Sequence, residues 1–243
     1  IVDLGHRLDL DVIAEGIETR DEIGANGRLH QSLVVEELMP SGGSGHDELP
    51  VALVPAGMIG TKSIDEALAE VARAVADAAD GLPRTAGLDL LVRRPPRLVS
   101  GAALPTIGAG PTRHLDAITA ALLSSGASYL AVQRPPGTGK TYVASQAIAR
   151  LVLDHGWRVG VTSQSHKAIE NVLRAVVAAG VPAAQVGKAT HGTTDAPWTA
   201  LTKADELAGF AAEHRAAGRG YVIGGTAWDL TNARRVQRGE LDL

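Results

Sequence analysis

One stretch of this 243-residue chain has the residue types and the spacing of a phosphate-binding loop: residues 134–141 read RPPGTGKT. A P-loop has the pattern G-x-x-x-x-G-K-[ST] between a strand and a helix, and its small residues let consecutive backbone N–H groups close around phosphate oxygens. The helix that begins near Lys140 directs its partially positive end at the same oxygens. We therefore expect Lys140 to reach the β- and γ-phosphates of ATP and the Thr141 hydroxyl to ligate Mg²⁺, so these two are the candidate catalytic residues and Thr141 is the candidate metal ligand. The candidate nucleotide-binding residues are Gln133, Pro135, Pro136, Gly137, Thr138, Gly139, Lys140 and Thr141.

Two details of the loop bear on this prediction. The chain has only five lysines against 18 arginines, so a lysine at this place in a glycine-rich loop is hard to attribute to chance. Position 134 departs from the pattern, because it holds Arg where the pattern has Gly, and a side chain there can strain the turn. The alternative interpretation is a glycine-rich turn that caps an ordinary helix.

The elements around the loop alternate between strand and helix. A short apolar strand is expected over 128–133, directly before the loop, and a helix over 141–155, which Gly156 ends. The other predicted elements are a helix over 115–122, strands over 158–163 and 221–226, and helices over 165–179 and 202–217. Strands that alternate with helices imply crossover connections and a parallel sheet covered on both faces, so the predicted fold class is α/β.

Upstream of the loop, two segments rich in Pro, Gly and Ser are interpreted as linkers, over 39–50 and 93–111. Between them a helix is expected over 63–80, with Ser63 and Glu66 as a capping box. The predicted parts of the chain are an N-terminal segment over 1–50, a helical lead-in with a Pro-rich linker over 51–111, and a partial P-loop domain over 112–243. We expect the part that precedes the P-loop domain to be mixed and mainly helical.

Composition excludes several classes of site. The chain has no cysteine, which excludes disulfides, cysteine-ligated zinc, iron–sulfur clusters and thiol nucleophiles. It has no run of 18 uncharged apolar residues and no readable targeting signal, so we expect a cytoplasmic protein without a membrane partner. Residues 1–50 carry 11 acidic and three basic side chains, whereas residues 51–243 carry 16 acidic and 20 basic ones, a balance that fits an anionic partner.

The stretch AVQRPPGTGKTYVASQAIARLVLDHGWRVGVTSQSHKAIENVL resembles superfamily 1 DNA/RNA helicases of the class fused to a RecB-like nuclease. VIGGTAWDL is similar to a later motif of that family, and LDLLVRRPPRL is similar to the lead-in to its helicase part. The resemblance implies a RecA-like domain that uses ATP and Mg²⁺ to move along single-stranded nucleic acid, DNA in preference to RNA. It also implies that Ser165, His166 and Thr226 contact the nucleic-acid backbone, although Ser165 is equally suited to cap the helix that follows it.

The chain departs from this family in two places. Leu115-Asp116-Ala117 stands where the family has a glutamine that reads adenine. Hydrolysis needs a carboxylate pair at the end of an apolar strand, and the one Asp-Glu pair after Thr141 is Asp205-Glu206, which we interpret as the solvated first turn of a helix. The apolar strand that would end in such a carboxylate pair is not found, and Leu241-Asp242-Leu243 looks like its first residues. We therefore expect this chain alone to be catalytically incomplete.

Other interpretations remain open. PPGTGKT is also common in AAA+ ATPases, and a non-catalytic nucleotide-binding module is a further alternative in which Arg134 marks a decayed site. Residues 1–22 resemble the helix and strand of an EAL-domain cyclic-di-GMP phosphodiesterase, in which Glu15 would take the place of a metal-site glutamate. One helix–strand unit cannot build a barrel active site, which draws its residues from several strands.

Overall fold

A computed structural model describes residues 17–23, 29–35, 60–133, 135, 137–190 and 196–243. The chain divides into two compact units, Ile1–Gly60 and Thr61–Leu243, and each is described by itself. The domain boundaries predicted at residues 50 and 111 stay predictions.

The first unit contains a β-hairpin. Strand β1 (Ile17–Ile23) pairs antiparallel with β2 (Leu29–Val35), and the register runs from Ile17 opposite Val35 to Ile23 opposite Leu29. Residues 17–22 of the EAL-like stretch lie in β1, whereas Glu15 and the rest of that stretch lie outside the described residues.

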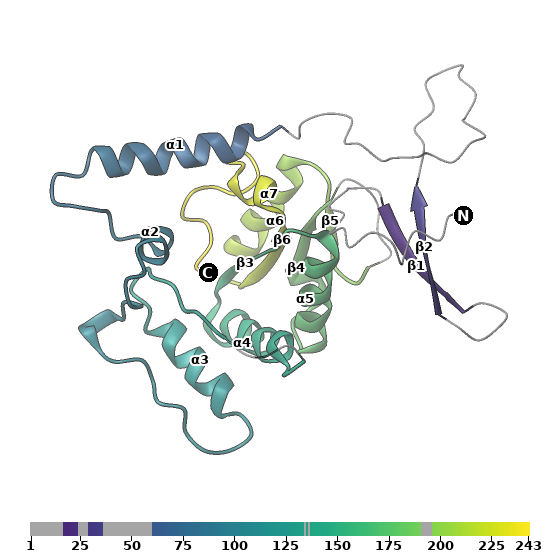
Figure 1. Ribbon diagram of the computed structural model, residues 1–243, viewed down its shortest axis with the longest axis horizontal. Coiled ribbons are helices and arrows are strands. Elements are labelled where there is room, and N and C mark those ends of the chain that lie inside the picture. The colour runs from purple at the N-terminus through teal and green to yellow at the C-terminus, as the bar shows by residue number, and fades with distance from the viewer. Residues whose placement is uncertain (1–16, 24–28, 36–59, 134, 136, 191–195) are drawn as a thin grey trace. The chain divides into compact units, whose positions relative to one another are not determined.

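The second unit is built around a four-stranded, all-parallel sheet (Figure 1). Its order is β3 (Arg158–Thr162), β6 (Tyr221–Gly225), β4 (Val186–Ala189) and β5 (Thr199–Leu201). The α/β class and the parallel sheet predicted from the sequence are confirmed. The strands predicted over 158–163 and 221–226 are β3 and β6, but β4 and β5 were not predicted, because strands of three and four residues are too short to show a period.

Helices bury apolar side chains on both faces of this sheet. One cluster joins β3 and β4 to α4 (Lys140–His155) and α5 (His166–Ala178), and the other joins β4 and β5 to α6 (Ala204–Ala216). The central strand β6 serves both clusters, since Val222 belongs to the first and Tyr221 and Ile223 to the second. Alternation of side chains along a strand produces this division. The three helices lie within one or two residues of the ranges predicted for them, and Gly156, at φ +68°, ends α4 as expected.

The remaining helices are shorter or peripheral. They are α1 (Lys62–Ala76), α2 (Ala86–Leu91), α3 (Arg113–Leu123), α7 (Ala227–Thr231) and two single turns of 3₁₀ helix at Val99–Gly101 and Ala183–Gln185. The predicted capping box of α1 is wrong: Thr61 is its N-cap residue, and the Ser63 hydroxyl donates instead to the backbone oxygen of Trp228 over 3.4 Å. No described helix is both long and apolar enough to cross a bilayer.

The strand predicted directly before the loop is also wrong. Residues 128–133 have no regular structure and do not join the sheet, and Val132 is 47% exposed. The start of the segment is held elsewhere, because the Ser128 hydroxyl donates to Asp89 over 3.3 Å and the Tyr129 hydroxyl donates to the Arg94 carbonyl over 2.7 Å. Tertiary hydrogen bonds to the α2 region thus decide the course of a segment whose composition alone favours a strand.

The outer edge of β3 is hydrogen-bonded to the last residues of the described chain. The backbone N–H groups of Asp242 and Leu243 donate to the Arg158 carbonyl, at 2.8 and 3.3 Å, and the Gly160 N–H donates to the Leu243 carbonyl at 2.7 Å. This is the ladder of a parallel pair, in which Leu243 stands opposite Val159. Asp242 also receives two hydrogen bonds from the Arg158 guanidinium, at 2.6 and 2.9 Å, and these hold the pKa of its carboxyl below the ordinary value. Residues 241–243 are not assigned to a strand, so the expectation that a further strand of the sheet opens here stays a prediction, supported by these hydrogen bonds.

Candidate nucleotide-binding site

The loop before α4 has the backbone conformation that its glycines allow. Gly137 and Gly139 have φ values of +73° and +78°, in the left-handed region that other residues enter at a cost. Gly139 is the N-cap residue of α4, so Lys140 is the first helical residue and Thr141 the second. The loop thus turns sharply and delivers consecutive N–H groups at the start of a 16-residue helix, the arrangement that suits an anion.

Two side chains of the loop converge on one carbonyl. The Lys140 ammonium donates to the Pro135 carbonyl over 3.2 Å, and the Thr138 hydroxyl donates to the same oxygen over 2.7 Å. Lys140 and Thr141 are both exposed, so a ligand in solvent reaches them. Gln133 and Pro135 are exposed as well, and Arg134 and Pro136 lie outside the described residues.

An open cavity of about 310 Å³ adjoins the loop. One side comes from the start of α3, with His114 and Leu115, and the other from the loop and the first turns of α4, with Tyr142 and Gln146. Tyr142 is 68% exposed, so its ring presents a large face to this space. The remaining lining residues are Pro111, Thr112, Thr138, Gly139 and Val143. The P-loop pattern did not indicate Tyr142 and Gln146, although their spacing of four places them on one face of a helix.

The expected base-reading stretch Leu115-Asp116-Ala117 has two different roles. Leu115 lines the cavity, whereas Asp116 accepts hydrogen bonds from Arg150 of α4, at 2.6 Å, and from the Thr112 hydroxyl, at 2.7 Å. These hydrogen bonds, the one from Arg150 above all, hold the pKa of the Asp116 carboxyl below its ordinary value. The ion pair joins α3 to α4 and so fixes the two walls of the cavity relative to each other.

The residues expected to contact nucleic acid follow the ends of two neighbouring strands. β3 ends at Thr162, opposite Gly225 at the end of β6, so Ser165 and Thr226 lie at the same carboxyl edge of the sheet. Ligands of open parallel sheets bind at this edge. His166 is the first residue of α5 and is half-buried.

Both hydroxyls at this edge cap helices. The Ser165 hydroxyl accepts from the Ala168 N–H over 3.2 Å, and the Thr226 hydroxyl donates to Asp229 over 2.8 Å. The capping role considered for Ser165 is therefore confirmed. Each hydroxyl still has the capacity for one further hydrogen bond, so capping does not exclude contact with a ligand.

Two carboxylates near this edge, those of Glu206 and Asp229, form hydrogen bonds and ion pairs with residues close to them in the sequence. Glu206 accepts from the Thr202 hydroxyl and from the backbone N–H groups of Thr202 and Lys203, and these bonds hold its pKa below the ordinary value. Asp205 and Glu206 form the exposed first turn of α6, as predicted. Asp229 is buried between Thr226 and Arg235, whose guanidinium lies 2.9 Å away. Among the described residues, no cluster of three or more acidic or histidine side chains has the arrangement of a metal site.

Comparison with protein-family models, with curated proteins and with solved structures finds no match for this chain.

Proposed function

We propose that this chain binds ATP together with Mg²⁺ through residues 133–141, as the nucleotide-binding part of a RecA-like motor of the superfamily 1 helicase type. The observation that carries the proposal is the pair of left-handed glycines at the start of α4, with Lys140 and Thr141 as the first two helical residues. In this conformation the backbone N–H groups at the start of α4 suit the oxygens of a phosphate chain.

Each part of the nucleotide has a counterpart in this proposal. Backbone N–H groups from Gly137 to Thr141 receive the phosphate oxygens, and Lys140 exchanges the Pro135 carbonyl for the β- and γ-phosphates. The Thr141 hydroxyl ligates Mg²⁺, which neutralises phosphate charge when bound. The base enters the cavity beside the loop, where the Tyr142 ring offers a stacking face and Gln146 offers an amide.

The proposed partner is single-stranded nucleic acid, DNA in preference to RNA, at the carboxyl edge of the sheet. Ser165, His166 and Thr226 are the proposed backbone contacts. Two exposed lysines at the same edge, Lys167 after β3 and Lys203 after β5, add the positive charge that phosphate contacts require.

A second candidate function is nucleotide binding without turnover. One observation favours it: residues 128–133 stand outside the sheet, so the loop is not anchored by a strand on its N-terminal side. The described carboxylates at the carboxyl edge, Glu206 and Asp229, are occupied by helix caps. Phosphoryl transfer needs a carboxylate that holds Mg²⁺ as well as the phosphate cradle, so we expect this chain alone not to hydrolyse ATP at a useful rate.

Calorimetric titration with ATP and ADP, with and without Mg²⁺, tests the proposal. We expect weak binding that Mg²⁺ strengthens and that Lys140→Ala abolishes. Lys62→Ala is the matched control, because Lys62 is an exposed lysine on the distant helix α1. Equal affinity in the wild type and in Lys140→Ala would overturn the site assignment. Phosphate release in the presence of single-stranded DNA, if lost in Lys140→Ala, would overturn the expectation of a catalytically incomplete chain.

A further inference from the structure

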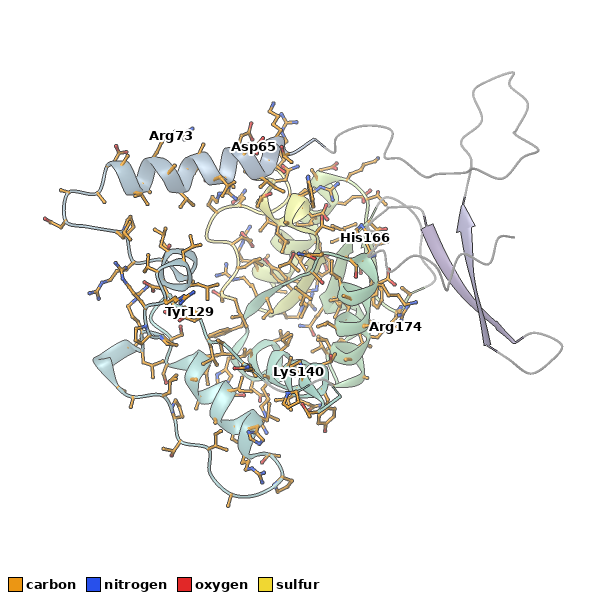
Figure 2. All side chains as sticks on the ribbon, viewed as in Figure 1. Asp65, Arg73, Tyr129, Lys140, His166 and Arg174 are labelled. Atoms are coloured by element: carbon orange, nitrogen blue, oxygen red, sulfur yellow. The ribbon has the colours of Figure 1, made fainter. Side chains whose placement is uncertain are left out.

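Helix α1 is tied to α7 and the segment after it by hydrogen bonds and one ion pair. None of its residues is buried, and its apolar side chains Leu68 and Val71 are 63% and 46% exposed. In Figure 1 it lies beside α7 and extends away from the sheet, and Figure 2 labels Asp65 at its α7 end and Arg73 farther along. A helix held without a buried apolar face gains little from packing, so its attachment depends on the few groups that tie it down.

Those ties are concentrated on α7 and the segment after it. The Ser63 hydroxyl donates to the Trp228 carbonyl and accepts from the Thr231 hydroxyl, both over 3.4 Å. The strongest tie is an ion pair, in which Arg238 donates to Glu70 over 2.8 Å. Both partners are about half exposed, so this ion pair is open to solvent and to competing ions.

The surface under α1 has the composition of a single-strand binding surface. It begins directly after Thr226, and Trp228 in the first turn of α7 is 40% exposed. Arg234 is exposed in the turn that follows α7, and Arg238 lies four residues further on. Arg235, between them, is paired with Asp229. An aromatic face beside guanidinium groups suits a strand whose bases stack while its phosphates pair with arginine.

Glu70 and a phosphodiester chain would compete for the same guanidinium. Glu70 is one of three acidic side chains on α1, with Asp65 and Glu66, against two basic ones, Lys62 and Arg73. A polyanion that pairs with Arg238 removes the partner of Glu70 and repels the Glu70 carboxylate at the same time.

From these contacts we propose that α1 is a displaceable strap over the α7 surface, and that single-stranded nucleic acid bound at Thr226 displaces it by taking Arg238 from Glu70. This inference rests on the proposed function, because it names the same nucleic-acid partner. The inference adds two features to the proposed function. One is a nucleic-acid surface made of Trp228, Arg234 and Arg238, and the other is the Glu70–Arg238 ion pair, which limits access to that surface.

Two measurements on the full chain test the strap. The first is the affinity for a labelled oligodeoxythymidine of about 20 nucleotides, measured by fluorescence anisotropy at about 50 mM salt. We expect Glu70→Gln to bind about two- to five-fold more tightly than the wild type, the range expected when one exposed ion pair is removed. Glu66→Gln is the matched control: it makes the same change on the same helix, but Glu66 pairs with Lys62 of α1 itself, at 3.9 Å. Arg238→Gln also frees α1, but it removes the guanidinium that would pair with a phosphate. We therefore expect this variant to bind the oligonucleotide no more tightly than the wild type does.

The second measurement is amide hydrogen exchange of α1 with and without the oligonucleotide. The strap predicts faster exchange over Lys62–Ala76 when the oligonucleotide binds, and faster exchange in Glu70→Gln without it. If the oligonucleotide binds the wild type and Glu70→Gln equally while α1 amides stay protected, the strap is wrong and the nucleic-acid function stands. If neither protein binds the oligonucleotide, the nucleic-acid function and the strap both fall.

Discussion

Arg150 of α4 donates a hydrogen bond to Asp116 of α3 over 2.6 Å, and this ion pair joins the two helices that wall the cavity beside the loop. Asp116 stands in the stretch that replaces a base-reading glutamine in the helicase family that the chain resembles. In the structure the Asp116 carboxylate pairs with Arg150 and the Thr112 hydroxyl, while its neighbours His114 and Leu115 line the cavity.

Asp116→Asn should therefore weaken the binding of a whole nucleotide, but not the binding of a phosphate chain that has no base. We expect the Kd for ATP to rise about three- to ten-fold, in line with the loss of one charged hydrogen bond, while the Kd for inorganic tripolyphosphate stays unchanged. Calorimetry with both ligands measures the difference. An equal loss for both ligands would show that the ion pair supports the whole loop rather than the cavity.

The same ion pair gives the folding stability of the second unit a pH dependence of known sign. The pKa of Asp116 is lowered in the folded protein, so its stabilising contribution is fully present above the ordinary aspartate pKa of about 4 and is lost as pH falls through the lowered value. Between neutrality and about pH 5, the pair should not change with pH. Thermal unfolding measured at a series of pH values reports this contribution. In Asp116→Asn the loss of stability at acid pH that comes from Asp116 should disappear.

Gly137→Ala should reduce nucleotide binding through backbone strain. A Cβ at Gly137 meets no atom within 4 Å, so the cost comes from φ +73° alone and amounts to about 1–2 kcal/mol. If the loop relaxes to avoid that cost, its N–H groups move off the phosphate positions, and we expect the Kd for ATP to rise at least about ten-fold. Gly218→Ala is the matched control, since Gly218 has φ +64° and open space but ends α6, away from the loop. Similar stability loss in both variants with lost binding only in Gly137→Ala would confirm the role of the loop.

Arg134→Gly should strengthen nucleotide binding. Position 134 is where the P-loop pattern has glycine, and a glycine there gains access to torsions that cost arginine about 1–3 kcal/mol when they are unfavourable. The expected result is a Kd for ATP lower by about ten-fold or more, measured beside the wild type by calorimetry. Weaker binding in the glycine variant would instead indicate that Arg134 contributes a phosphate contact.

Asp89→Asn should destabilise the second unit and disturb the approach to the loop. Asp89 has no exposed surface and receives Arg97 at 2.8 Å, Arg94 at 3.3 Å and the Ser128 hydroxyl at 3.3 Å. Burial alone would raise the pKa of Asp89, but the hydrogen bonds from Arg97 and Arg94 outweigh it and hold the pKa below its ordinary value.

Asparagine keeps one oxygen acceptor but has no charge and offers an NH₂ group where the second carboxylate oxygen was, so Arg97 and Arg94 lose their shared ion-pair partner. Arg97 still donates to the carbonyls of Gly126 and Ala127. We expect Tm to fall by about 5–10 °C, whereas the exposed control Asp80→Asn should leave it within about 1 °C. A Tm unchanged in Asp89→Asn would mean that the cluster adds nothing to the stability of the fold.

The sequence alone determined the features that depend on neighbouring residues. Gly156 marks the end of α4, Ser165 marks the cap of α5, and the alternation of strands with helices predicts the parallel sheet, because each signal acts over a few residues. The glycine-rich pattern likewise predicts a sharp turn directly before α4, and Gly137 and Gly139 have the positive φ values that such a turn requires. That this turn binds phosphate stays a prediction.

Only the tertiary structure decided the features that depend on distant partners. A strand needs an edge to pair with, and the edge of β3 is hydrogen-bonded to Asp242 and Leu243, while residues 128–133 are drawn toward Asp89 and Arg94. Ser63 could equally cap its own helix or bond elsewhere, and the proximity of Trp228, 165 positions away, decided between them. Asp116 has the same chemistry in a base-reading site and in an ion pair, so its role depended on where Arg150 lies, which no local pattern encodes.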